Sequence, residues 1–130
     1  DYTRTQGDDE LEPVTDTAEL DEVISDIDRI SVAHSIHEYI VQIAGATRRH
    51  PDLRLGVSTR GTLSLLRIAR AFAATDDRDF VTPDDIKALV SPVFGHRVAL
   101  SAEAELRGVT IETLMADISD SVPVPRTSGA

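Results

Sequence analysis

The 130-residue sequence is long enough for one domain with a packed core. Its 23 acidic and 13 basic residues give a formal net charge of −10, which argues against general nucleic-acid binding because phosphate contacts need basic surface. The absence of cysteine excludes disulfides, thiolate metal sites and a thiol nucleophile, and it fits a reducing, cytoplasmic compartment. No apolar run reaches the ~18 residues that a membrane-spanning helix needs.

The first part of the chain predicts a connector followed by a helix. Residues 1–16 lack apolar periodicity and are rich in acid, which is typical of an acidic connector. Apolar residues then recur at helical spacing over 17–28, and Asp16 with Glu19 resembles a capping pair. Because the chain opens on polar residues without an initiator methionine, we expect a fragment of a longer protein.

Two longer helices are predicted next. The apolar face over 33–49 ends with Arg48 and Arg49, whose charges suit the negative end of the helix dipole, and Pro51 prevents continuation. The segment 59–75 is apolar over a wide arc, which predicts a central helix. This arc consists of Leu63, Leu65, Leu66, Ile68, Ala69, Phe72 and Ala73.

The C-terminal half predicts further helices and a short sheet. Thr82-Pro83-Asp84-Asp85 is a strong helix start, with a Thr cap, proline in the first turn and acids at the positive end. Pro92 interrupts the stripe that follows, so two short helices are expected to meet near Ser91. The segments 53–55 and 96–100 can both be extended and can pair as two strands.

A last helix is predicted to begin at Thr110, before a Pro-containing polar tail at 121–130. The predicted fold class is therefore all-α. It is a small bundle of five to six helices over residues 17–120, with the short two-stranded β pairing as an addition.

The most informative residue is Arg60. The run from Gly56 to Leu63 predicts a helix start with Ser58 as its N-cap. Arg60 then lies in the first turn, where the positive end of the dipole disfavours a cation by a few tenths to roughly 1 kcal/mol. A cation held there suggests a nearby anion, and a helix N-terminus itself binds phosphate. Ser58, Thr59 and Arg60 are therefore the candidate phosphate-binding residues, with a local salt bridge of Arg60 as the alternative.

Four ordered segments carry a resemblance that extends from about Leu11 to Pro125. They are Ala46–Pro51, Leu55–Gly61, Arg78–Ile86 and His96–Val98. Together they resemble the C-terminal lid of MoxR-type AAA+ ATPases. The sequence departs from the family pattern at three places. Thr59 often corresponds to Pro, Gly61 often corresponds to Ala, and Asp76-Asp77 replaces a Gly before Arg78.

The resemblance implies that Arg60 is the sensor-2 arginine, which contacts nucleotide phosphates from the lid, in its own subunit or in a neighbouring one. It implies ATP and Mg²⁺ in the full-length parent. The family's Walker A lysine, Walker B acids, sensor-1 residue and arginine finger belong to the preceding core domain, so the fragment alone is expected to hold no cofactor and to hydrolyse no ATP. The implied partners of this chaperone-like ring are its own AAA+ core domain, neighbouring ring subunits and von Willebrand A-domain proteins.

Several other residues support weaker hypotheses. His34, His37 and Glu38 share a helical face but lack a further ligand, so no metal site is expected. His96 and Arg97 match the family pattern without an assigned role. Arginines also cluster in the middle of the chain, at Arg48, Arg49, Arg54, Arg67 and Arg70. They can form a solvated surface, or a docking surface for the core domain or a neighbouring subunit.

The alternative function is of a different class. The chain would then be a free-standing helical protein-interaction module with no nucleotide role. Neither reading includes a nucleic-acid partner or insertion into a membrane.

Overall fold

The computed structural model describes residues 11–126. Most of the predicted acidic connector and the end of the predicted tail lie outside the described residues. The described part contains six α-helices, one 3₁₀ helix and a two-stranded sheet, which confirms the predicted all-α class with a short β pairing. The elements are α1 (Thr17–Asp28), α2 (His34–Arg49), β1 (Leu53–Leu55), α3 (Thr59–Thr75), α4 (Pro83–Phe94), η2 (Gly95–Arg97), β2 (Ala99–Leu100), α5 (Ala102–Leu106) and α6 (Ile111–Ser121).

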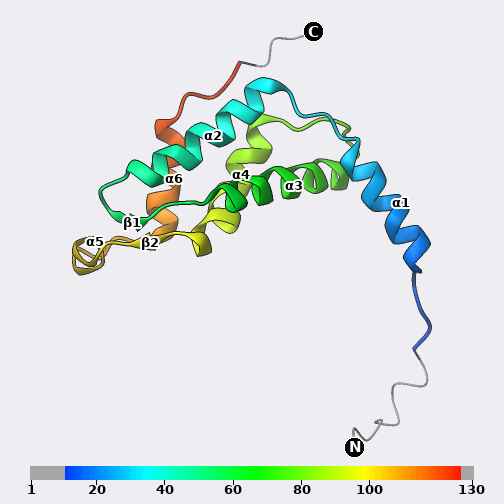
Figure 1. Cartoon of the computed structure of the whole chain (residues 1–130), viewed down its shortest axis with the longest axis horizontal. Helices are drawn as coiled ribbons and strands as arrows, with labels where there is room; N and C mark the ends of the chain where they lie inside the picture. The colour runs from blue at the N-terminus through cyan, green and yellow to red at the C-terminus, as the bar shows by residue number, and fades with distance from the viewer. Residues whose placement is uncertain (1–10, 127–130) are drawn as a thin grey trace, which may run out of the picture.

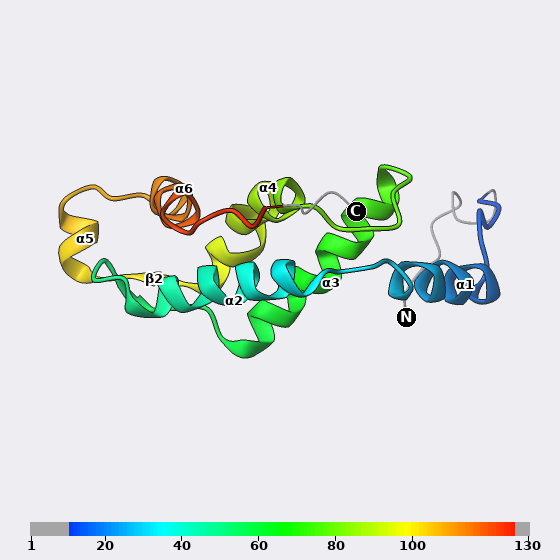
Figure 2. The same cartoon turned by 90° about the horizontal axis from the view of Figure 1, so that it is seen from above.

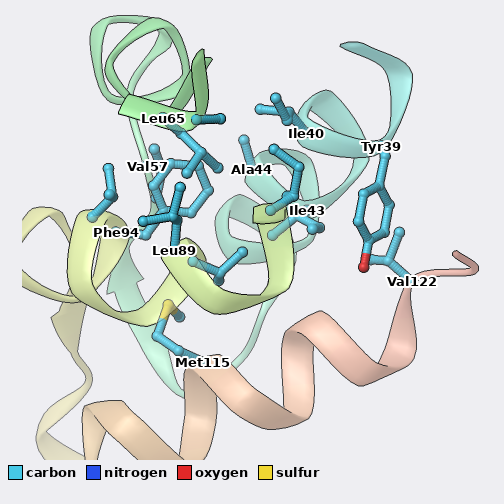
Figure 3. Packing of buried hydrophobic residues seen from close by; sticks show 14 of the residues in the cluster. Tyr39, Ile40, Ile43, Ala44, Val57, Leu65, Leu89, Phe94, Met115 and Val122 are labelled. Carbon is cyan, nitrogen blue, oxygen red and sulfur yellow. The ribbon is translucent and has the colours of Figure 1, made fainter. Parts of the chain in front are cut away.

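The core lies between α2, α3, α4 and α6, and its residues come from all four helices (Figure 3). It is mainly aliphatic, as the composition predicts, with Tyr39 and Phe94 as its two large aromatic side chains. Ile43 and Leu65 are fully buried where α2 meets α3. In Figure 3, Met115 reaches into the cluster from α6.

The first helix contributes no buried residue to this core and contacts the bundle at α3. In Figures 1 and 2, α1 extends away from the other helices at one end of the molecule. It begins as predicted, because the Asp16 side chain accepts a hydrogen bond from the Glu19 backbone N–H at 2.8 Å. None of its residues is buried, however, and Leu20, Val23 and Ile24 are about half-exposed. Its apolar periodicity therefore predicted a helix but did not place it in the core.

Helix α3 contacts α1, α2 and α4, as expected of a central helix, but only a narrow part of its wide apolar arc is buried. Only Gly61, Leu65, Ala69 and Ala73 of α3 are buried, and Leu66 is half-buried. Because this stripe is mostly of small residues, α3 packs closely against α2 and α4 along one side. The apolar side chains around that stripe stay outside, with exposed fractions of 51% for Leu63, 41% for Ile68 and 40% for Phe72.

The region around Pro92 forms one helix, not the predicted two. Helix α4 continues through Pro92, because Val93 and Phe94 extend its buried stripe on the far side of the proline. Pro92 itself is exposed, and so is Ala88, whose carbonyl loses its helical donor and lies on the solvent side. The sixth helix is instead α5, which the sequence reasoning missed because it spans only five residues.

The predicted strand pairing is present but shorter than expected. β1 and β2 are antiparallel, with Leu53 opposite Leu100 and Leu55 opposite Ala99, and the register is irregular between these pairs. His96 and Arg97, which were expected to be extended, lie in the 3₁₀ helix η2. The strand therefore begins only after the chain has turned out of α4.

The start of α4 is held by an ion pair inside a capping box. Thr82 and Asp85 bond each other's backbone N–H groups, at 3.3 and 2.8 Å. Arg78 donates two further bonds to the Asp85 carboxylate, at 2.7 and 2.6 Å. Burial favours the neutral form of Asp85, but the bonds from Arg78 and Thr82 outweigh it and lower its pKa. The bonds to Asp85 and then Asp76 raise the pKa of Arg78.

The turn between α3 and α4 explains one departure from the MoxR pattern. Asp77 adopts a left-handed backbone conformation, with φ of 53°. Glycine adopts this region freely, and aspartate is among the few other residues that tolerate it. Asp77 therefore keeps the turn that a glycine forms elsewhere.

Candidate functional site

The start of α3 is built as the sequence predicts. Ser58 has an extended backbone, and its side-chain oxygen accepts a hydrogen bond from the Gly61 N–H at 3.2 Å. Thr59 and Arg60 are the first two residues of the helix, and both are exposed, as is Ser58. The first N–H groups of a helix have no partners within it, so this end can donate to an external acceptor.

Arg60 has no counter-ion in the described part of the chain. Its side chain forms neither an ion pair nor a hydrogen bond there. Arg78, by contrast, pairs with Asp85 and Asp76, and Arg107 pairs with Asp52. Arg49, Arg54 and Arg67 are also exposed and form no ion pair in the described residues, so Arg60 is distinguished by its place in the first turn of a helix.

The helix start also lacks the acidic residues that balance other helix starts in this protein. α1, α4, α5 and α6 each carry Asp or Glu in the first turn, whereas α2 and α3 carry none, and only α3 has an arginine there. The positive end of the α3 dipole is therefore uncompensated, and Arg60 adds a full positive charge to it. The combined field favours an external anion such as phosphate.

Gly61 brings a second arginine to the same turn. A Cβ atom at Gly61 would lie 2.8 Å from Val57 Cγ1 and 3.2 Å from Arg97 Cδ, so the absence of a side chain lets both residues pack against the helix. Arg97 is half-buried, and its Nε atom is buried without a hydrogen-bond partner in residues 11–126. His96, the neighbouring motif residue, is exposed. The sequence identified Arg97 as a motif residue but could not place it beside Gly61.

The loop that leads into α3 is fixed by the end of α2. The Thr47 hydroxyl accepts a hydrogen bond from the Val57 N–H at 2.9 Å, and Arg48 Nε donates to the Val57 carbonyl at 2.7 Å. Sequence reasoning assigned no role to Thr47. The backbone N–H that binds its hydroxyl belongs to Val57, ten residues along the chain. Helical periodicity predicted only that Thr47 faces the core.

The remaining arginines do not gather at one place. Arg48 and Arg49 end α2, Arg54 lies on β1, and Arg67 and Arg70 lie on α3. Arg67 lies on the same face of α3 as Arg60, because a spacing of seven residues leaves the two only about 20° apart around the helix axis. Arg70 is half-buried, with its Nε atom lacking a partner in the described residues.

The histidine-containing face of α2 does not form a metal-ligand cluster. His34 Nε2 lies 3.2 Å from a carboxylate oxygen of Glu38, and both side chains are exposed. Within residues 11–126 no group of three or more His, Cys, Asp or Glu side chains is arranged to hold a metal ion. The same residues contain no helix that is long and apolar enough to cross a membrane.

Comparison with known proteins decides the family. The AAA lid domain family matches residues 45–118, which is more than half of the chain and includes α3 with Arg60, and also Arg97. This chain belongs to that family. The matched range begins near the end of α2 and ends in α6, so it includes all of α3 and α4 and parts of the other two core helices.

Relatives place the lid among MoxR-type proteins. It is 38% identical over 115 residues to YeaC of Bacillus subtilis, a protein without a characterised role. The aligned residues cover 88% of this chain and 36% of YeaC. It is 39% identical over 74 residues to Protein MoxR of Paracoccus denitrificans, covering 56% of this chain and 22% of that protein. Chaperone MoxR1 of Mycobacterium tuberculosis is 26% identical over 106 residues, covering 75% and 28%.

A solved structure supports the same assignment. The crystal structure of a candidate ATPase from Cytophaga hutchinsonii matches with a TM-score of 0.76 at 29% identity, covering 81% of this chain and 34% of the other. The chain is thus a MoxR-type AAA+ lid. It spans about a third or less of the length of these relatives.

Proposed function

We propose that this lid is the sensor-2 domain of a MoxR-family AAA+ ATPase, and that Arg60 contacts the terminal phosphates of ATP bound by the ATPase core. The observation that carries the proposal is the state of Arg60. It is an exposed arginine without a counter-ion in the described residues, and it lies on a capped helix start without first-turn acids. Backbone N–H groups at Ser58 and Thr59 would add to the same anion site.

The contribution of Arg60 would be electrostatic. During phosphoryl transfer negative charge spreads over the phosphate oxygens, and a guanidinium aimed at them stabilises that charge. ATP supplies the transferred phosphoryl group and Mg²⁺ neutralises part of its charge in the parent protein. Because the contact depends on the γ-phosphate, hydrolysis would release Arg60 and let the lid move. The isolated lid, which lacks the core motifs, is proposed to be inactive.

The proposed partners are the lid's own AAA+ core domain and neighbouring ring subunits. The outer face of α3 supports this docking, because Leu63 and Arg67 lie on the same side of the helix as Arg60. An open apolar hollow of about 180 Å³ adjoins Leu63 and is lined also by Val41 and Leu66. A domain that presents a nucleotide to Arg60 would also cover this apolar surface.

The wider role follows from the family. The name of the relative Chaperone MoxR1 supports a chaperone-like role. Assembly into a ring, nucleotide-driven movement and a cytoplasmic location are proposed together with that role. Von Willebrand A-domain proteins are proposed as further partners. In this scheme residues 17–120 are the lid, residues 1–16 are the connector to the core domain, and residues 121–130 are a tail.

The test is Arg60→Ala in the whole ATPase that carries this lid. We expect the turnover number to fall roughly 10-fold or more, with the melting temperature of the lid nearly unchanged because Arg60 forms no intramolecular pair in the described structure. Arg54→Ala is the matched control, since it removes the same charge from another exposed arginine, which lies on β1 and not on the proposed docking face of α3. Unaltered turnover in Arg60→Ala would refute the sensor role, and equal losses in both variants would assign the effect to general charge.

A further inference from the structure

Both polar backbone groups of Val57 are held by consecutive residues of α2. The Thr47 hydroxyl donates to the Ala44 carbonyl at 2.6 Å and accepts from the Val57 N–H at 2.9 Å. Arg48 Nε donates to the Val57 carbonyl at 2.7 Å. Thr47 has no exposed surface, so water does not compete for its bonds. The loop before α3 is therefore tied to the last turn of α2 by two hydrogen bonds, and the bond from Thr47 to Ala44 within α2 orients the hydroxyl.

Close contact between the two backbones adds to this attachment. A Cβ atom at Gly56 would lie 2.6 Å from the Cα atom of Arg48, closer than real Cβ atoms approach. Only glycine allows the loop to cross α2 at this distance. The Val57 side chain is 1% exposed and packs in the core, which removes the remaining freedom of the loop.

This attachment lies just before the proposed sensor. Ser58, the N-cap of α3, follows Val57 directly, and Arg60 comes two residues later. We propose that Thr47 and Arg48 are positioning residues that fix the start of α3, and hence Arg60, relative to α2. The proposal rests on the proposed function of Arg60. Thr47 is fully buried and acts only through this connection.

Positioning matters here because the contact of Arg60 with phosphate depends on geometry. A misplacement of about 1 Å at a reacting centre can lower a rate on the order of 100-fold. Loosening the loop without unfolding α3 should have a smaller effect. We expect the turnover number to fall roughly 3- to 30-fold when one side of the attachment is removed.

The first experiment compares two adjacent arginines in the ATPase that carries this lid. Arg48→Met removes the bond to the Val57 carbonyl, whereas Arg49→Met removes the same charge from the same helix end, and both residues are exposed. We expect ATP turnover to fall in Arg48→Met and to change less than about twofold in Arg49→Met. Equal turnover in the two variants would overturn the positioning role of Arg48.

The second experiment concerns the hydroxyl of Thr47. Thr47→Val removes the acceptor of the Val57 N–H, and Thr47→Ser retains it, so turnover should fall in the first variant and recover in the second. Thr82→Val is the control, because it removes a hydroxyl that caps α4, beyond the opposite end of α3. Equal losses of turnover in Thr47→Ser and Thr47→Val would show that the Thr47 hydroxyl does not position Arg60. Equal losses in Thr82→Val and Thr47→Val would lead to the same conclusion.

A double-mutant cycle shows whether these residues act through Arg60. In an Arg60→Ala background, Arg48→Met and Thr47→Val should lower turnover by less than about 1.5-fold further, because their target is already absent. Effects that multiply with Arg60→Ala would overturn the proposal and indicate a direct role. A normal rate in Arg60→Ala alone refutes the sensor function itself, whereas a slow Arg60→Ala beside a normal Arg48→Met and Thr47→Val refutes only the positioning.

Discussion

The orientation of α3 about its own axis, and so the face that it buries, can be tested by a pair of adjacent substitutions, Leu65→Ala and Leu66→Ala. Leu65 is fully buried between α2 and α4, whereas Leu66 is half-buried at the edge of the core. The two positions differ by about 100° around the helix. Sequence reasoning placed both in the core of a central helix, so the structure makes the sharper prediction.

The expected loss of stability differs because the two side chains differ in burial. Leu65→Ala removes apolar surface that is wholly shielded and leaves a cavity, so it should lower the free energy of unfolding by about 3–5 kcal/mol. Leu66→Ala removes a side chain that already contacts water, and neighbours can relax into the space, so we expect a loss of about 1–2 kcal/mol. For a domain of this size, each 1 kcal/mol lowers the melting temperature by roughly 3–5 °C.

Urea unfolding followed by far-UV circular dichroism measures both values on the 130-residue chain. The slopes of the transitions should be equal, which shows that the substitutions act on the folded state. If Leu66→Ala costs as much as Leu65→Ala, the orientation of α3 is wrong. That outcome also bears on function, because the rotation of α3 determines the direction of Arg60, which lies about 140° from Leu65 around the helix and is exposed.

Three other predictions concern the site and its support. Gly61→Ala should lower the free energy of unfolding by up to about 2 kcal/mol, because the new methyl group clashes with the stiff Val57 side chain. The higher helix propensity of alanine offsets part of this loss. A gain in stability against urea would refute the packing. Asp85 has a lowered pKa in the folded state, so its stabilising effect is complete above the pKa of an unfolded aspartate and is lost as pH falls below about 4. The stability difference between the wild type and Asp85→Asn should therefore be large at pH 7 and shrink in acid, and a pH-independent difference would contradict the ion pair. Deleting residues 11–28 should leave the melting temperature within about 3 °C, since α1 buries no side chain, and a larger loss would show that α1 packs on the bundle.

Local chemistry explains what could be read from the amino-acid order alone. Caps, prolines and apolar spacing act over three or four residues, so they predicted the starts of α1, α3 and α4 and the all-α class. The same reach placed Arg60 in a first turn and Ser58 as its cap, which is why the candidate site could be named from sequence. The assignment to the lid family rested on four motifs in order.

Contacts between distant residues decided the rest. Periodicity shows that a helix has an apolar face, but the partners of that face determine whether it is buried. The apolar face of α1 therefore stays exposed, and the outer side of α3 was wrongly expected to be buried. Pro92 ends a helix unless packing on both sides of it continues the stripe, as Phe94 does here. The bonds of Val57 to the end of α2 join residues nine and ten positions apart. Such contacts form only when the chain folds back on itself, and they determine where the start of α3 lies.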